Sequence, residues 1–134
     1  MAVRTAAAGR SDHSLKLALT AARVAEENRG RDILILDMRE LTSVFDYFVI
    51  ATGASVRQLH AISDEIELVV KNSLGDRKIG REGYTEGGWV LIDYGDVIIH
   101  LFDDKSRDYY GLEDLWGDAR RVPLSPELGV RSAE

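Results

Sequence analysis

The sequence contains no cysteine, only two prolines and no long apolar run. Without cysteine the chain has no disulfide framework, no thiol nucleophile and no thiolate ligand for zinc. The lack of disulfides suits the reducing cytosol, so we expect a cytoplasmic protein. No stretch approaches the roughly 18 consecutive apolar residues of a membrane-spanning helix, and no apolar run follows the N-terminal arginines as in a secretory signal. We therefore expect no association with a membrane.

Basic residues are in the minority. Lys and Arg number 17 against 23 Asp and Glu, which gives a net charge of −6. A surface that binds the phosphates of nucleic acid needs a basic excess, so direct, sequence-specific nucleic-acid binding is disfavoured as the main activity. An acidic domain complements a basic protein partner, although ordinary solubility explains the same charge.

The chain of 134 residues has the length and composition of one folded domain, with 45% hydrophobic and 30% charged residues. Its prolines, Pro123 and Pro126, both lie near the end. We expect a flexible leader at residues 1–13, an α/β domain at 14–122 and a flexible tail at 123–134.

Hydrophobic patterning predicts three helices and four strands. The helices are expected at residues 14–28, 56–74 and 106–116, and the strands at 32–37, 47–51, 89–94 and 97–102. On the last helix, one face is expected to carry Tyr109, Leu112, Glu113 and Trp116. Helices packed on a mixed sheet of four or more strands make a single α/β domain.

The connections constrain the topology. Only residues 38–46 separate the first two strands, which is too short for a parallel crossover, so these strands pair antiparallel or are not neighbours. The last two strands form a hairpin through Gly95 and Asp96. The second strand, its helix and a later strand make a βαβ unit.

A glycine turn, Gly53-Ala54-Ser55, lies between a predicted strand and a helix, where free amides can hold a phosphate. Nucleotidyltransferases follow such a turn with a strand that carries Asp-x-Asp for two magnesium ions. The next clear strand here offers only Asp93, because Asp96 lies beyond a turn. Ser55 and Gln58 also have the spacing of a capping box, which explains the turn without a ligand. We expect no metal, no cofactor and no catalytic residue.

A histidine among carboxylates is a second candidate site. His100 lies in the last predicted strand, near Asp93, Asp96, Asp103 and Asp104. Such a histidine can act as a general base or bind a metal. The other two histidines lie in unrelated segments, and no hydroxyl has an evident base beside it. A structural or interface role for His100 is therefore favoured over catalysis.

The C-terminal third combines aromatic and acidic side chains. The aromatic residues are Trp89, Tyr94, Tyr109, Tyr110 and Trp116, and the acidic residues among them are Asp93, Asp96, Asp108, Glu113 and Asp114. Aromatic residues are enriched at the centres of protein interfaces, so this cluster predicts a surface that docks on a protein. Two alternatives stay open: the tryptophans belong to the core beside a solvated acidic face, or the rings stack on nucleic-acid bases, which needs basic residues alongside.

Three segments carry a more specific signal: DYFVIATGASVRQ at 46–58, WVLIDYGDVIIHLF at 89–102 and RDYYGLEDLWGDA at 107–119. Together they resemble the ribosomal silencing factor family, also called RsfS or Iojap, and the resemblance extends over residues 15–119. It implies a nucleotidyltransferase-like α/β fold without transferase activity. Family members bind the large ribosomal subunit through its L-fourteen protein, block joining of the small subunit and lower translation when nutrients are scarce. Organellar relatives assist large-subunit assembly, and homodimers occur in the family.

The resemblance also implies partner-binding residues. Trp89 matches the family's interface tryptophan. The other positions in matching motifs are Asp93, Asp96, His100, Tyr109, Tyr110 and Glu113. The sequence therefore predicts a translational repressor that works by occupancy. The alternatives are a large-subunit assembly factor and a nucleotidyltransferase-type phosphate-binding enzyme.

Overall fold

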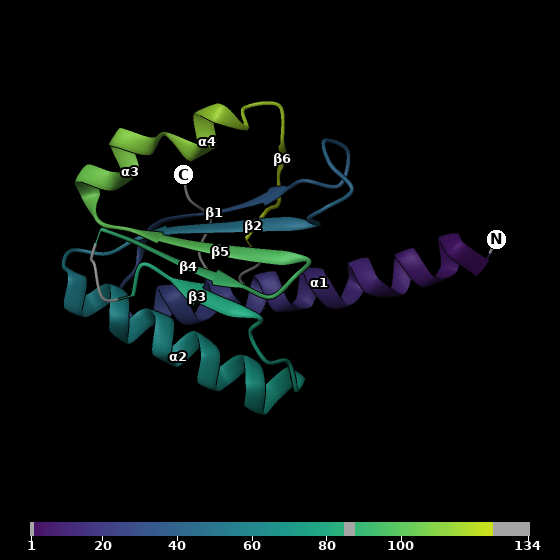
Figure 1. Ribbon diagram of the computed structural model, residues 1–134, viewed down its shortest axis with the longest axis horizontal. Helices are drawn as coiled ribbons and strands as arrows, with labels where there is room; N and C mark the ends of the chain where they lie inside the picture. Colours follow the sequence, from purple (N-terminus) through teal and green to yellow (C-terminus); the bar gives the residue numbers. More distant parts are fainter. Residues whose placement is uncertain (1, 85–87, 125–134) are drawn as a thin grey trace.

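The structure is a computed structural model that describes residues 2–84 and 88–124 (Figure 1). Its strands form one six-stranded sheet in the order β3-β4-β5-β2-β1-β6. In chain order the elements are α1 (Ala2–Glu27), β1 (Arg31–Asp37), β2 (Tyr47–Thr52), α2 (Val56–Leu74), β3 (Gly80–Glu82), β4 (Trp89–Asp93), β5 (Val97–Phe102), α3 (Asp104–Tyr110), α4 (Leu112–Leu115) and β6 (Arg120–Arg121). Helices α1 and α2 cover one face of the sheet, and the short helices α3 and α4 lie over the other (Figure 1). The predicted α/β class with a mixed sheet is confirmed.

The sheet topology follows the predicted connections. β1 and β2 are antiparallel neighbours, and β2 lies parallel to β5 with α2 in the long connection between them. β4 and β5 form the antiparallel hairpin, whose turn contains Gly95 at φ 89°, a conformation that favours glycine. The sequence does not predict β3 and β6, because strands of three and two residues are too short to show a periodic pattern.

Burial on both faces explains why β2 and β5 are continuous apolar runs. All six residues of each strand are buried. Val49 and Ile99 belong to the apolar cluster beneath α1 and α2, together with Ile62 of α2. Phe48 and Phe102 belong to a second cluster on the opposite face, beneath α3 and α4.

The first helix is longer than the sequence predicts. We expect a flexible leader at residues 1–13, whereas α1 begins at Ala2. The leader is rich in alanine, the strongest helix former, which favours a helix that extends toward the N-terminus. At the predicted boundary, His13 is exposed, whereas Ser14 and Leu17 are buried.

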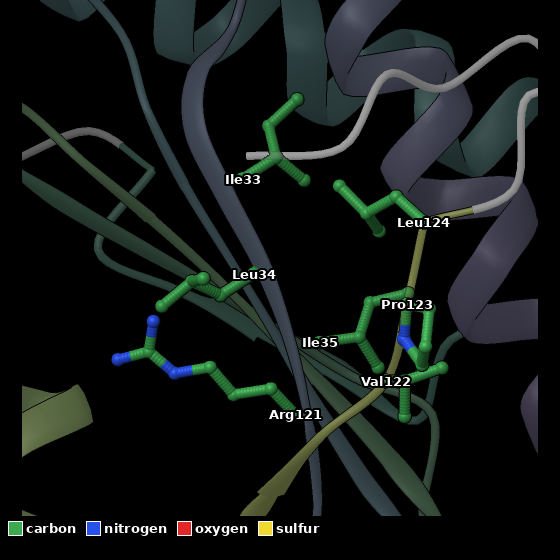
Figure 2. Close-up of a pocket in the computed structure, with 7 residues that line it drawn as sticks. All are labelled: Ile33, Leu34, Ile35, Arg121, Val122, Pro123 and Leu124. Carbon is green, nitrogen blue, oxygen red and sulfur yellow. The ribbon is translucent and has the colours of Figure 1, made fainter. Parts of the chain in front are cut away.

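At the other end, the predicted tail starts at residue 123, but Leu124 is buried against the core. The chain follows the edge of β1 here, and the Val122 amide donates to the carbonyl of Ile35 (2.9 Å). A cavity of about 160 Å³ lies between this segment and β1, with apolar side chains of both around it (Figure 2). The domain therefore includes Leu124, and residues 125–134 of the predicted tail lie outside the described residues.

The prediction of a single helix at residues 106–116 is wrong, because two short helices, α3 and α4, occupy this segment. Gly111 adopts a left-handed conformation (φ 52°), and its amide donates to the carbonyl of Arg107, which ends α3 and separates it from α4. The expected common face is also lost, because Tyr109 is 82% exposed while Leu112 is buried. A glycine inside an apparently helical pattern was the signal for this break.

Helix α2 begins with the predicted cap. Ser55 Oγ accepts a hydrogen bond from the Gln58 amide (3.1 Å). Gln58 Oε1 accepts from the Ala54 amide (2.6 Å), one residue before the position that a capping box uses. The Gln58 Nε2 atom also donates to the carbonyls of Asn28 and Arg29, where α1 ends. Gln58 thus joins the start of α2 to the end of α1.

Replacing Gln58 with alanine is expected to lower the free energy of unfolding by about 1–2 kcal/mol, because the Ala54 amide and two carbonyls lose a partner. Urea denaturation measures the change. Arg57→Ala, at an exposed neighbouring position of the same helical turn, is the control and is expected to change stability by less than about 0.5 kcal/mol. Equal midpoints for the two variants would contradict the capping role of Gln58.

Candidate functional site

The register of the β4–β5 hairpin places Trp89 on the face of the sheet opposite α1 and α2. Trp89 pairs with Phe102, and Leu91 pairs with His100. Because side chains alternate along a strand, these four side chains share one face. Trp89 and Leu91 pack against the apolar cluster that contains Phe102.

Five rings meet here, and we call them the aromatic face: Trp89, His100, Phe102, Tyr109 and Tyr110. The ring centroid of Trp89 lies 4.5 Å from that of Tyr110 and 5.0 Å from that of Phe102. The rings of Tyr109 and Tyr110, both from α3, are 5.0 Å apart and edge-to-face. Phe102 and His100 are buried, Trp89 is half-buried, and Tyr110 is 47% exposed. The aromatic face therefore has a rigid buried floor and an exposed rim.

His100 is a buried acceptor, with 4% of its surface exposed. Its Nδ1 atom accepts a hydrogen bond from the indole Nε1–H of Trp89 (3.2 Å). An imidazole that accepts at Nδ1 carries its proton on Nε2 and is neutral. Burial lowers the pKa of His100 from its ordinary value of 6.5 to about 4. The structure therefore supports the structural or interface role, with His100 as a neutral acceptor for Trp89.

We expect His100 to make the free energy of unfolding fall as the pH is lowered. Between pH 6.5 and about 4, the unfolded chain protonates His100 while the folded protein keeps the ring neutral, so the unfolded state gains the proton and stability falls as the pH is lowered. The pKa difference corresponds to about 3 kcal/mol. Unfolding free energies of the wild type and of His100→Asn, measured by urea denaturation from pH 7 to 4, test this. The wild type is expected to lose more stability over that range, and parallel curves would contradict it.

The predicted carboxylates do not gather around His100. Asp93 Oδ1 accepts from the Gly95 amide (2.7 Å), so it shapes the hairpin turn at the far end of β4 from Trp89, about 13 Å along the strand. The carbonyl of Asp96 accepts from the amides of Asp46 and Tyr47. Both residues lie at the turn rather than in the aromatic face.

The two aspartates after β5 have other roles. Asp103 caps α3 by accepting from the Ser106 amide (2.8 Å). Asp104 forms an exposed ion pair with Arg31 (3.0 Å). Within residues 2–84 and 88–124, no group of three or more His, Asp or Glu side chains is placed to hold a metal ion.

Glu113 also lies outside the aromatic face. Its Oε2 atom accepts from Nε of Arg107 (2.8 Å), and Nη1 of Arg107 donates to Oγ1 of Thr52 (2.6 Å). Arg107 is only 8% exposed. This pair therefore ties α3 and α4 to β2 and holds the helix that carries the two tyrosines. Sequence reasoning missed Arg107, because arginine is rarely buried and nothing in its spacing indicates burial.

The other two aromatic residues of the predicted cluster are partly buried and lie outside the aromatic face. Tyr94 packs against the cluster beneath α1 and α2. Trp116 packs edge-to-face on Phe48, with centroids 6.2 Å apart. Both tryptophans are partly buried against the same apolar cluster, and they differ in the rings that they contact.

Backbone amides of the glycine turn before α2 already donate hydrogen bonds to side chains of this chain. The amides of Ala54 and Gln58, which a phosphate would need, are bonded to the side chains of Gln58 and Ser55. A Cβ at Gly53 would meet the side chain of Leu59 at 2.7 Å, so glycine at this position lets Leu59 pack close to the turn. The geometry thus supports capping at this turn.

A shallow cavity of about 230 Å³ opens beside the aromatic face, lined by Glu82, Gly83, Trp89 and Leu91. Gly83 has φ 77° and approaches the carbonyl of Trp89 so closely that a Cβ has no room. Sequence reasoning missed Leu91 and Glu82. Alternation along β4 was the signal for Leu91, whereas Glu82 comes from a strand too short to predict.

Among the described residues, no helix has the length and apolar character needed to cross a membrane. The family model described as ribosomal silencing factor during starvation, RsfS, matches residues 11–134. The chain belongs to the RsfS family. The resemblance stated from the three motifs is thereby confirmed.

Similar proteins include RsfS relatives and a solved structure. A Bacillus subtilis protein named ribosomal silencing factor RsfS is 45% identical over 105 residues, covering 78% of this chain and 87% of that protein. A crystal structure of a Chromobacterium violaceum protein has a TM-score of 0.74 and 36% identity, covering 84% of this chain and 92% of that one. A mouse protein named mitochondrial assembly of ribosomal large subunit protein 1 is 33% identical over 92 residues, covering 67% of this chain and 40% of that protein. The nucleotidyltransferase-like description of the fold stays a prediction.

Proposed function

We propose that this RsfS-family protein binds the large ribosomal subunit through its L-fourteen protein and blocks joining of the small subunit. The aromatic face is the docking surface. The observation that carries this proposal is the exposed rim of Tyr109 and Tyr110 beside the half-buried Trp89 and over a buried floor, because rigid aromatic side chains are the usual anchors of a protein interface.

The surrounding charge fits a basic partner. The protein carries a net charge of −6, and Asp108 and Asp114 are exposed on α3 and α4. Glu82 lines the cavity next to Trp89. A lysine or arginine of the partner can pack its stem on the indole there and pair its charge with the carboxylate. Complementary charge of this kind speeds encounter and excludes wrong partners.

Binding of the protein to the large subunit is sufficient to block joining of the small subunit. A specific interface needs about 800 Å² from each partner, and a bound domain then fills space that the small subunit requires. No covalent step is involved, so we propose that the protein is not an enzyme and acts in the cytoplasm, where subunits join. Formation of a homodimer is a further proposal, which light scattering of the purified protein tests.

Co-sedimentation with purified ribosomal subunits tests the docking proposal. The protein is expected to sediment with large subunits and to stay in the supernatant with small subunits. A second arm adds purified L-fourteen protein as competitor, which is expected to release the bound protein from large subunits. Equal sedimentation with both subunits, or no effect of the competitor, would overturn the proposed partner.

The name of the mouse relative favours a second candidate function, assembly of the large subunit. The same docking surface serves this function if the protein binds before the subunit matures. Sucrose-gradient profiles of cells depleted of the protein distinguish the two. Accumulation of precursor large subunits in rich medium indicates assembly, whereas normal subunits with excess joined ribosomes during starvation indicate silencing.

A further inference from the structure

His100 is placed to act on the docking tryptophan rather than on a partner. Its ring is buried between Phe48, at a centroid distance of 4.8 Å and edge-to-face, and Phe102, at 6.2 Å and nearly parallel. With 4% of the residue exposed, it offers no surface for a partner to touch. Its polar contact in the structure is the hydrogen bond that Nδ1 accepts from Trp89.

Trp89 needs such a partner because of where it lies. It is the first residue of β4, and the β3–β4 pairing runs only from Asp93 to Leu91. Its direct cross-strand partner is Phe102, and His100 is the diagonal neighbour two residues away on β5. A large, half-exposed side chain at the start of a strand can adopt more than one rotamer. In the structure, Nε1 of the indole donates to the buried ring of His100 while the indole also contacts Tyr110.

We propose that His100 is a positioning residue: as a neutral acceptor it fixes the indole of Trp89 in the orientation that docks. This inference rests on the proposed role of the aromatic face. Fixing the side chain before binding removes an ordering cost that binding otherwise bears, so the effect is on affinity.

The proposed role requires a hydrogen-bond acceptor at position 100, in the place that Nδ1 occupies in His100. His100→Asn keeps one, since the amide oxygen lies at the same distance from Cβ as Nδ1 does in histidine. His100→Leu keeps the apolar volume and removes the acceptor. Trp89→Phe removes the donor and keeps an aromatic ring. These three variants separate the hydrogen bond from packing.

Affinity for purified large subunits is the first readout. His100→Leu is expected to bind about ten-fold more weakly than the wild type, and His100→Asn to recover at least half of the loss on a logarithmic scale. In the Trp89→Phe background, His100→Leu is expected to have no further effect, because the bond is already absent. Equal affinities for His100→Leu and the wild type, or the same ten-fold loss in both backgrounds, would overturn the proposal.

Nuclear magnetic resonance of the free protein is the second readout and does not depend on the ribosome. At pH 7, the ¹⁵N shifts of His100 are expected to show an unprotonated Nδ1 and a protonated Nε2. The indole N–H of Trp89 is expected to exchange more slowly with water than that of Trp116, and to lose this protection in His100→Leu but not in His100→Asn. The opposite tautomer, or unprotected Trp89, overturns the positioning role. If the wild type does not bind large subunits, the docking proposal fails, and the resonance data still decide the role of His100.

Discussion

Trp89→Ala is expected to weaken binding to large ribosomal subunits by at least about 30-fold, corresponding to about 2 kcal/mol. The indole contacts Tyr110 at the rim and Phe102 at the floor, so in the proposed docking surface its loss removes the anchor between them. Because Trp89 is only half-buried, the free energy of unfolding is expected to fall by less, about 1–2 kcal/mol. Binding is measured by co-sedimentation over a range of concentrations, and stability by urea denaturation.

Trp116→Ala is the matched control. This tryptophan is also partly buried, and it packs on Phe48 rather than on the rings of the aromatic face. It is expected to lose a similar amount of stability while its affinity changes by less than about three-fold. Equal losses of affinity for the two variants would show that the effect comes from general destabilisation rather than from the anchor. A folded Trp89→Ala protein that binds normally would remove Trp89 from the interface.

Arg107→Met is expected to be the most damaging single change to stability, lowering the free energy of unfolding by about 3–5 kcal/mol. The guanidinium is buried and donates to Thr52 and Glu113, so its removal leaves the carboxylate of Glu113 without the partner of its Oε2 atom. Affinity for large subunits is expected to fall as well, because Arg107 anchors the helix that carries Tyr109 and Tyr110.

A nearby exposed pair provides the comparison. Arg31 bonds to Asp104 with both side chains largely exposed, and Arg31→Met is expected to cost less than about 1 kcal/mol. The double variant Arg107→Met with Glu113→Gln is expected to recover part of the loss, because it no longer buries an unpaired charge. Urea denaturation of the three variants measures these values. A cost for Arg107→Met as small as that for Arg31→Met would contradict its structural role.

Much of the fold could be predicted because local patterns determine it. The spacing of Ser55 and Gln58 predicts the start of α2, and the turn at Gly95 predicts the β4–β5 hairpin. The short connection between β1 and β2 predicts their antiparallel pairing. Each feature depends on residues close together in the sequence, so the local pattern carries the information.

The errors in the predicted fold have equally local causes. Gly111 ends α3 inside a segment whose apolar spacing resembles one helix, because a left-handed residue costs glycine little. Leu124 is buried after a proline that usually indicates a tail, since the edge of β1 offers it an apolar surface.

The candidate site could be predicted only in part. Trp89, His100, Tyr109 and Tyr110 meet as expected from their motifs, and alternation along β4 and β5 explains why the first two share a face. Glu113 does not join them, because its partner is Arg107, which no pattern indicates as buried. Contacts of this kind join side chains from separate elements, and spacing along one element does not encode them.

We propose that the protein acts by occupying the large subunit, and light scattering during subunit joining tests this most directly. Purified large subunits are incubated with saturating protein, small subunits are added, and the rise in scattering is followed. We predict that the wild type abolishes the rise, that Trp116→Ala does so too, and that Trp89→Ala at the same concentration does not. Normal joining at saturating wild-type protein would contradict the claim.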